Sequence, residues 1–208
     1  MTHYGMAIDT NRCVGCNTCA MACKSENNIP EGVWWNRVQT EGGEAAYTPS
    51  GIYPDDLAMR FYTVACQHCE EPACLAVCPT GATQRDEETG NIIVDYQACI
   101  GCQSCINACP YQGVRTFNEK EPAYFLDFAT GDQEVPAHQQ GVVEKCTFCN
   151  HRVKRGEKPA CIHVCRASAR TFGDLDDPES ALSKLLAERE YDQLLADEGT
   201  KPSVFYLK

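Results

Sequence analysis

Residues 99–109 have the sequence CIGCQSCINAC, and residues 13–23 have the near copy CVGCNTCAMAC. Both stretches space four cysteines as C-x2-C-x2-C-x3-C. A second pair of related stretches, PACLAVC at 72–78 and PACIHVC at 159–165, repeats at nearly the same separation. Self-similarity at a fixed separation indicates a repeated structural unit. The chain is therefore one unit used twice, and each copy contains two cysteine quartets.

The four quartets account for all 16 cysteines of the 208-residue chain. Three thiolates on one tight loop can reach three adjacent corners of a cubane cluster, while the fourth cysteine lies one helical turn further along. In two-cluster ferredoxins this fourth cysteine ligates the other cluster. The pattern predicts four 4Fe-4S clusters bound by these quartets: Cys13, Cys16, Cys19, Cys23; Cys66, Cys69, Cys74, Cys78; Cys99, Cys102, Cys105, Cys109; Cys146, Cys149, Cys161, Cys165.

Two other uses of cysteine fit the pattern less well. Disulfides form in oxidising compartments, and cysteines separated by two residues rarely pair usefully. Zinc sites with four cysteines use two separated C-x2-C pairs, not three thiolates within seven residues followed by a fourth. A zinc scaffold stays as the structural alternative to iron–sulfur clusters.

Spacing along the sequence predicts which quartets share a module. Cys78 and Cys99 are close enough for a compact two-cluster ferredoxin, whereas Cys23 and Cys66 are too far apart. Quartets two and three should therefore pair, and so should quartets one and four. Exchange of the fourth cysteine within each module gives four ligand sets: Cys13, Cys16, Cys19 and Cys165; Cys146, Cys149, Cys161 and Cys23; Cys66, Cys69, Cys74 and Cys109; Cys99, Cys102, Cys105 and Cys78.

The expected fold is α+β, with two interleaved bacterial-type ferredoxin modules, long loops and a C-terminal helix. The module of quartets two and three is inserted into the other one. The expected division is 1–65 plus 141–173 for quartets one and four, 66–118 for quartets two and three, 119–140 as a loop, and 174–208 as a C-terminal helix and tail that docks a partner.

Local signals predict a few short elements outside the cysteine loops. These are strands at 91–95, 114–117 and 169–172, and a helix at 178–197. Asp177 is the expected cap of this helix, and Pro178 suits its first turn. The cysteine-free segments 24–65 and 111–145 are predicted to be long surface loops, which are usually functional.

Charge and hydropathy exclude several classes of partner. The formal net charge is −11, and bound thiolates would add more, so neither nucleic acid nor an anionic membrane surface is expected. No apolar window is long enough to span a bilayer. No export signal is expected in the first residues. The expected location is cytoplasmic, or membrane-associated or periplasmic if an exported partner carries the folded chain.

The order of the quartets, together with EKCTFC at 144–149, resembles the iron–sulfur subunit of complex molybdopterin oxidoreductases. Dimethyl sulfoxide, polysulfide and respiratory arsenate reductases have such subunits. The resemblance implies the same ligand exchange and a larger catalytic partner that holds molybdenum or tungsten. In nitrate reductase-like members Trp replaces the second cysteine of the third quartet, and that site holds a three-iron cluster. Cys102 at this position implies four irons.

The chain departs from this family pattern at two positions. Lys24 and Arg166 follow a quartet directly, where Pro79 and Pro110 follow the other two. Because local charge is one determinant of cluster potential, both are candidate residues for raising a potential. Ordinary solvated surface charges are the alternative.

The expected function is electron transfer, and the chain has no catalytic site of its own. It contains no phosphate-binding glycine loop, no flavin or nicotinamide fingerprint and no nucleophile constellation. Electrons would pass through four clusters between a donor, either quinol through a membrane anchor or a soluble donor, and the molybdopterin subunit. By resemblance, the set with Cys13 lies nearest that subunit and the set with Cys99 farthest. The alternative is a free polyferredoxin shuttle.

Metal analysis tests the central expectation. Protein purified without oxygen should contain about sixteen iron and about sixteen acid-labile sulfide per chain, because each cubane takes four thiolates. Stoichiometric zinc without labile sulfide would contradict it.

Overall fold

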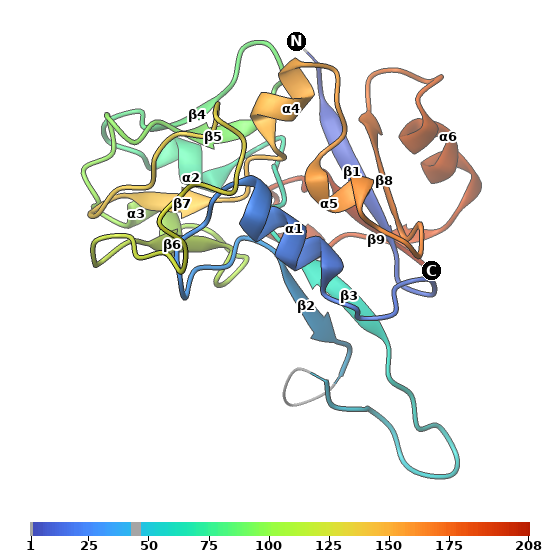
Figure 1. The fold of residues 1–208 in the computed structure, drawn as a ribbon. Helices are drawn as coiled ribbons and strands as arrows, with labels where there is room; N and C mark the ends of the chain where they lie inside the picture. Colours follow the sequence, from blue (N-terminus) through green and yellow to red (C-terminus); the bar gives the residue numbers. More distant parts are fainter. Residues whose placement is uncertain (1, 43–46) are drawn as a thin grey trace.

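A four-stranded sheet brings residues near the two ends of the chain together. In the computed structural model, which describes residues 2–42 and 47–208, the strand order is β8-β1-β10-β9 (Figure 1). Central strand β1 pairs in parallel with β10 and antiparallel with β8. The strands are β1 (Tyr4–Asp9), β8 (Arg170–Asp174), β9 (Tyr191–Asp192) and β10 (Val204–Leu207).

The two faces of this sheet pack against different parts of the molecule. Successive strand residues point to opposite faces, so alternate residues of β1 belong to different clusters. Ala7 packs with Leu182 of helix α6 (Ala181–Glu188) on one face. Met6 and Ile8 pack on the other face, in a cluster that contains Cys19, Cys23, Cys66, Cys146 and Cys161. One face of the sheet therefore forms a wall of the cysteine-rich interior.

Three two-stranded hairpins and several short helices complete the fold. None of the helices that carry cysteines is longer than nine residues within the described chain. The hairpins are β2 (Arg37–Thr40) with β3 (Phe61–Val64), β4 (Thr83–Arg85) with β5 (Ile92–Val94), and β6 (Arg115–Phe117) with β7 (Val143–Lys145). The remaining helices are α1 (Thr18–Glu26), α2 (Ala73–Ala76), α3 (Ser104–Asn107), α4 (Asn150–Lys154), α5 (Ala160–His163) and the 3-10 turn η1 (Ala196–Glu198).

The sequence duplication reappears in the backbone of the first and third cysteine loops. Gly15 and Gly101 have φ values of 66° and 68°, a left-handed conformation that glycine adopts without steric cost. The residues before helices α1 and α3, Asn17 and Gln103, both have φ of 59°. The two C-x2-C-x2-C loops therefore present their cysteines in the same way.

The short strands expected at 91–95, 114–117 and 169–172 are confirmed as β5, β6 and β8. The helix expected at 178–197 is wrong in its extent, because α6 ends at Glu188. Its cap is Ser180, whose hydroxyl accepts from the Ser183 amide at 3.0 Å. The helix stops because Arg189 is extended and the next residues join the sheet as β9, paired with β10.

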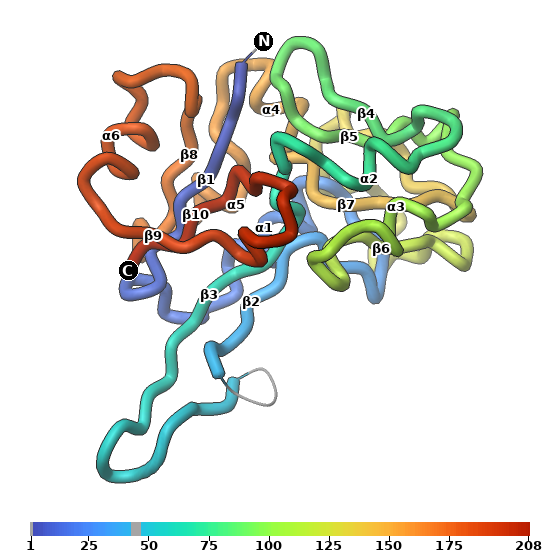
Figure 2. The backbone as a smooth tube through the Cα atoms, turned by 180° about the vertical axis from the view of Figure 1, so that it is seen from behind, coloured from blue at the N-terminus to red at the C-terminus, as the bar shows by residue number. Residues whose placement is uncertain are grey.

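The two cysteine-free segments are not wholly irregular. The first, 24–65, contains the β2–β3 hairpin, and beyond it residues 47–60 extend as an arm away from the body (Figures 1 and 2). Ile52 and Tyr53 on this arm are 72% and 80% exposed. The second segment, 111–145, contains β6 and β7, with no helix or strand between them in the described chain. No helix of the described residues is long and apolar enough to cross a membrane.

The contact between α6 and the sheet provides a test of the fold. Leu182 is fully buried among Ala7, Phe205 and Leu207, so Leu182→Ala should lower the free energy of unfolding by about 2–5 kcal/mol. The matched control Leu126→Ala removes the same atoms from a half-exposed loop residue and should change stability by less than about 0.5 kcal/mol. Anaerobic denaturation followed by circular dichroism measures both, and equal losses would contradict this packing.

Candidate metal centres

The first group of thiols combines the first and fourth quartets. Burial raises the pKa of Cys13, and the nearby sulfurs of Cys19 and Cys165 raise it further. Cys16, on the same loop, is exposed. Cys165 is held by a hydrogen bond from the Ala169 amide to its sulfur at 3.4 Å. We call Cys13, Cys16, Cys19 and Cys165 the Cys13 group.

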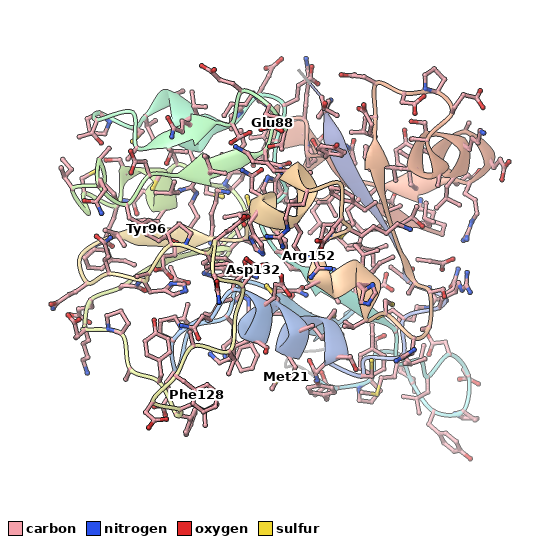
Figure 3. The ribbon with its side chains drawn as sticks, turned by 45° about the horizontal axis from the view of Figure 1, so that its top comes forward. Met21, Glu88, Tyr96, Phe128, Asp132 and Arg152 are labelled. Atoms are coloured by element: carbon pink, nitrogen blue, oxygen red, sulfur yellow. The ribbon has the colours of Figure 1, made fainter. Side chains whose placement is uncertain are left out.

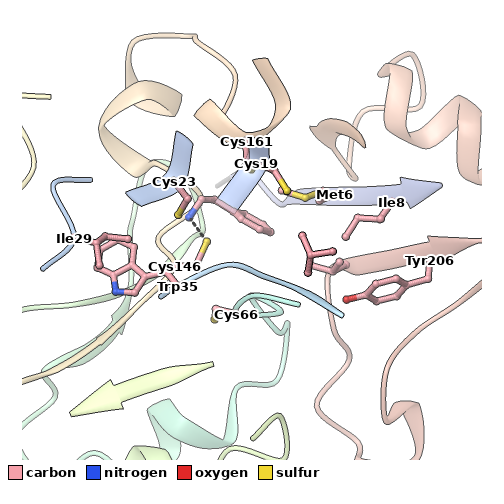
Figure 4. Close-up of a cluster of buried hydrophobic side chains, with 13 residues drawn as sticks. Met6, Ile8, Cys19, Cys23, Ile29, Trp35, Cys66, Cys146, Cys161 and Tyr206 are labelled. Carbon is pink, nitrogen blue, oxygen red and sulfur yellow. Dashed lines mark hydrogen bonds between the residues drawn. The ribbon is translucent and has the colours of Figure 1, made fainter. Parts of the chain in front are cut away.

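The second group also crosses between these two quartets. Burial raises the pKa of Cys23 well above its ordinary value, and the thiols of Cys146, Cys149 and Cys161 raise it further. Figure 4 shows Cys23, Cys146 and Cys161 in one buried cluster. All four of these cysteines are buried. We call them the Cys23 group.

The third group combines the second and third quartets. The pKa of Cys69 is raised to about 11, first by burial and then by the thiols of Cys66 and Cys74. The pKa of Cys109 is also raised to about 11, first by burial and then by the same two thiols. Cys109 thus lies with cysteines of another quartet. We call Cys66, Cys69, Cys74 and Cys109 the Cys66 group.

The fourth group of thiols lines a small hollow near the surface. Cys78, Cys99, Cys102 and Cys105 line it together, and we call them the Cys78 group. The Thr83 amide donates to the Cys78 sulfur at 3.4 Å. The second cysteine of the first quartet and that of the third have similar surroundings. A hydrogen bond from Thr18 lowers the pKa of Cys16, and one from Ser104 lowers the pKa of Cys102.

The four groups form a series with exposed ends. Cys19 and Cys161 are electrostatic neighbours that join the Cys13 group to the Cys23 group, and Cys66 and Cys146 join the Cys23 group to the Cys66 group. Cys74 of the Cys66 group and Cys105 of the Cys78 group belong to one buried cluster. Cys16 and Cys102 are the exposed cysteines, and they belong to the first and last groups. The two middle groups lie inside the protein, apart from the half-buried Cys109.

The residues of these groups fit iron–sulfur clusters. Thiolates are the ligands that such clusters prefer, yet burial opposes ionisation of thiols such as Cys149, whose pKa it raises to about 12. Iron would supply the compensating positive charge. Buried N–H donors without a partner in the described chain also lie beside the thiols, among them Arg115 Nη2 and Asn36 Nδ2. Donors of this kind suit cluster sulfur, and the bound clusters would supply one-electron redox chemistry.

Polar residues that the sequence did not single out hold these thiols. Asn27 Nδ2 donates to Cys23 O at 2.9 Å and lies 3.8 Å from Cys23 Sγ and 3.9 Å from Cys149 Sγ. The Phe148 amide donates to Cys146 Sγ at 3.4 Å. The place of Asn27, four residues after Cys23, is a signal that could have identified it, since that spacing lies on one helical face.

His68 has a packing role in the structure. It is buried and stacks on Phe148, with ring centroids 3.7 Å apart. The Ile92 amide donates to Nδ1 at 3.2 Å, so Nε2 carries the proton and donates to Cys146 O at 3.0 Å. Both ring nitrogens are therefore engaged with backbone groups.

The two cations that follow a quartet directly have different surroundings. Lys24 Nζ donates to Pro30 O at 2.6 Å and Val33 O at 3.0 Å, and it lies 4.7 Å from the centre of the Trp34 ring. Arg166 is exposed. Lys24 thus fixes the start of the long loop, whereas Arg166 is a solvated surface charge.

A cluster of charged side chains lies between helices α1 and α4, near Asp132 and Arg152 in Figure 3. Glu26, Asp132 and His151 can bring three ligand atoms within 4.8 Å of one another. Arg152 already bonds both Glu26 oxygens, at 3.2 and 3.1 Å, and Arg155 bonds Asp132. These contacts make the cluster an ion-pair network that joins the two helices.

Comparison with protein families agrees with this chemistry. Residues 57–124 and 133–175 match the model of the 4Fe-4S dicluster domain. Residues 6–26 match the model of the 4Fe-4S binding domain. Together the matched segments include all four quartets, and sixteen cysteines suit four such clusters.

Three relatives that match over nearly the whole chain are named as parts of reductases. A Halobacterium salinarum protein, named as an iron–sulfur subunit of dimethyl sulfoxide reductase, is 50% identical over all of this chain and 79% of its own length. The arsenate respiratory reductase iron–sulfur subunit of a Shewanella species is 36% identical over 98% and 95% of the two chains. A polysulfide reductase component of Wolinella succinogenes is 37% identical over 97% and 92%. The chain therefore belongs to the family of iron–sulfur electron-transfer subunits that includes those of dimethyl sulfoxide reductase and polysulfide reductase.

Proposed function

We propose that the protein relays electrons through four 4Fe-4S clusters between a donor and a molybdopterin-containing catalytic subunit. The observation that carries this proposal is the series of four thiol groups, buried in the middle and exposed at both ends. Electrons can enter and leave a protein only where a partner approaches a cluster closely. A buried middle with two exposed ends suits a relay.

The ligand sets of the relay are the four thiol groups. The Cys23 group and the Cys66 group each take one cysteine from a different quartet, as expected for exchanged fourth ligands. The electrostatic contacts of Cys23 with Cys146, Cys149 and Cys161 support this exchange, and so do those of Cys109 with Cys66 and Cys74. The same exchange divides the chain into two interleaved ferredoxin modules, 1–65 plus 141–173 and 66–118.

The exposed ends are the proposed contact points with partners. The Cys13 group faces the catalytic subunit, and the Cys78 group faces the donor, either a membrane anchor or a soluble protein. The assignment of one end to the catalytic subunit and of the other to the donor is taken from the resemblance to the family. The exposure of Cys16 and Cys102 supports the placing of these two groups at the ends.

Exposed apolar side chains favour a permanent subunit over a free shuttle. The arm at 47–60 presents Ile52 and Tyr53, and the chain next to its base packs on the first cysteine loop, where Phe61 fills the space beside Gly15. Phe125 and Phe128 are 84% and 63% exposed, and they line a shallow hollow together with Met21 of α1 (Met21 and Phe128 are labelled in Figure 3). Groups of large apolar side chains on a surface are typical of interaction sites.

Three cysteine variants test the exchanged ligand sets. Cys78→Ser and Cys102→Ser change different quartets, yet both should alter the same cluster signal in electron paramagnetic resonance, because both ligate one cluster. Cys109→Ser shares a quartet with Cys102 but should alter a different signal. If Cys102→Ser leaves three thiolates, an oxidised three-iron signal is expected there. The exchange would be wrong if Cys109→Ser and Cys102→Ser changed one common signal.

The Cys102 and Cys16 variants also test the order of the relay in the assembled complex. With Cys102→Ser, turnover driven by the physiological donor should fall, while a small dye that reduces the catalytic subunit should still support turnover. With Cys16→Ser, the donor should still reduce the other three clusters, but substrate should no longer reoxidise them. The opposite pattern would reverse the two ends.

The isolated chain should transfer electrons without catalysis. Anaerobic protein should pass electrons from a reduced dye to an oxidised one, and it should not reduce S-oxides, oxyanions or polysulfide until the catalytic subunit is added. The reason is that no substrate site accompanies the thiol groups in the described residues. Turnover by the pure chain would contradict the proposal.

A further inference from the structure

Two arginines occur in the same tripeptide, Arg-Thr-Phe, and both begin a strand. Arg115 begins β6, and Arg170 begins β8. Arginine is rarely buried unless it is paired, yet their exposed fractions are only 4% and 8%. No carboxylate contacts either guanidinium among the described residues. Their counter-charges must therefore come from elsewhere.

Arg170 lies between the Cys13 group and the Cys23 group. Arginine does not lose its proton in proteins, so the buried guanidinium is a fixed positive charge. Its nearest charged neighbours are the thiols of Cys161, Cys19 and Cys165. Uncharged groups hold the guanidinium in place: Asn36 Oδ1 at 3.3 Å, Met6 Sδ at 3.5 Å and the Thr63 hydroxyl.

Arg115 lies between the Cys66 group and the Cys78 group. Its nearest charged neighbours are the thiols of Cys74, Cys66, Cys105 and Cys109, which belong to both groups. Nη1 lies 3.5 Å from the Thr83 hydroxyl, while Nη2 has no hydrogen-bond partner in the described chain. Its strongest neighbour, Cys74, is the third cysteine of its quartet, and so is Cys161, the strongest neighbour of Arg170.

A third cationic side chain lies at the remaining junction. Lys145 is 1% exposed and precedes Cys146 of the Cys23 group. Its ammonium donates to the carbonyl oxygens of Cys146, at 2.9 Å, and Ile92. It also lies within electrostatic range of Cys74 in the Cys66 group. Cations and thiol groups thus alternate along the series.

We propose that Arg170, Lys145 and Arg115 are three potential-setting residues, one at each junction of the four-cluster relay. Reduction adds one electron to a site that already holds four thiolates, so the reduced state gains the most from a nearby fixed cation. The interior screens this attraction weakly. A cation at a junction favours reduction of the clusters on both sides, so it raises both of their potentials together.

This inference rests on the ligand sets proposed above, and charge removal tests it in the holoprotein. Arg170→Gln should lower the equilibrium constant for reduction of both flanking clusters about tenfold, which corresponds to ~59 mV for a one-electron couple. The cluster of the Cys78 group should keep its potential. Arg115→Gln should show the reverse selectivity. Redox titration followed by electron paramagnetic resonance gives the potentials, and iron analysis verifies the loading.

Arg166→Gln is the matched control. It removes the same charge one residue from Cys165, but from an exposed position, where water and salt screen it. The change that Arg166→Gln causes in the cluster potentials should be much smaller than the change caused by Arg170→Gln. Equal shifts from the two variants would overturn the inference, and so would unchanged potentials in a fully loaded Arg170→Gln protein.

Two further variants separate charge from structure. Arg170→Lys keeps the cation and should retain four clusters and most of the potential. A Lys variant that lost iron or shifted like the Gln variant would overturn the inference, because shape and not charge would then matter. Asn36→Asp places a carboxylate against the intact guanidinium, so it should lower the same two potentials even if Arg170→Gln loads poorly. An unchanged potential in Asn36→Asp would also overturn it.

The cysteine variants keep the two proposals distinguishable. If the ligand sets are wrong, Cys78→Ser and Cys102→Ser will alter different signals, whatever Arg170 does. If only the role of the cations is wrong, the cysteine variants will behave as expected and the potentials of the arginine variants will not move selectively.

Discussion

Sulfur that must be both buried and ionised is the constraint on which this structure depends. A thiolate inside a protein needs a compensating charge, and the chain as a whole is acidic, with a formal net charge of −11. The buried hydrophobic clusters of the described residues, apart from the one around Leu182, all contain cysteines. Iron–sulfur clusters therefore occupy the position that a continuous apolar core has in other proteins of this size, and the short helices and hairpins are arranged around them.

In the duplicated cysteine loop, the second cysteine and the last cysteine have different surroundings. The second cysteine of the first and third quartets, Cys16 and Cys102, is exposed. The last cysteine of the same two quartets, Cys23 or Cys109, lies instead among thiols from a different quartet. One short motif thus provides both an exposed thiol and a thiol that joins two quartets in the interior, which are the two features that the proposed relay requires.

Much of the cluster chemistry could be predicted from the sequence because it depends on local spacing. The quartets, the strands at β5, β6 and β8 and the similarity of the first and third loops follow from residues close together in the chain. The β2–β3 hairpin, the end of α6 at Glu188 and the strand β10 could not be predicted in this way, because their partners are distant: Val204 pairs with Met6, and Arg37 with Val64. The burial of the two Arg-Thr-Phe arginines also depends on distant partners, although the repeated tripeptide is a usable signal.

The pairing of β1 with β10 makes the enclosure of the first and fourth quartets depend on a distant part of the chain. Residues 66–118, in contrast, contain two complete quartets within one short stretch of sequence. The other two quartets are separated by that stretch, and the sheet that encloses them closes only when residues 204–207 insert beside β1. Long-range pairing of this kind is slow. The Cys13 and Cys23 groups are therefore enclosed only after a long-range pairing, whereas the cysteines of residues 66–118 are close together in the sequence.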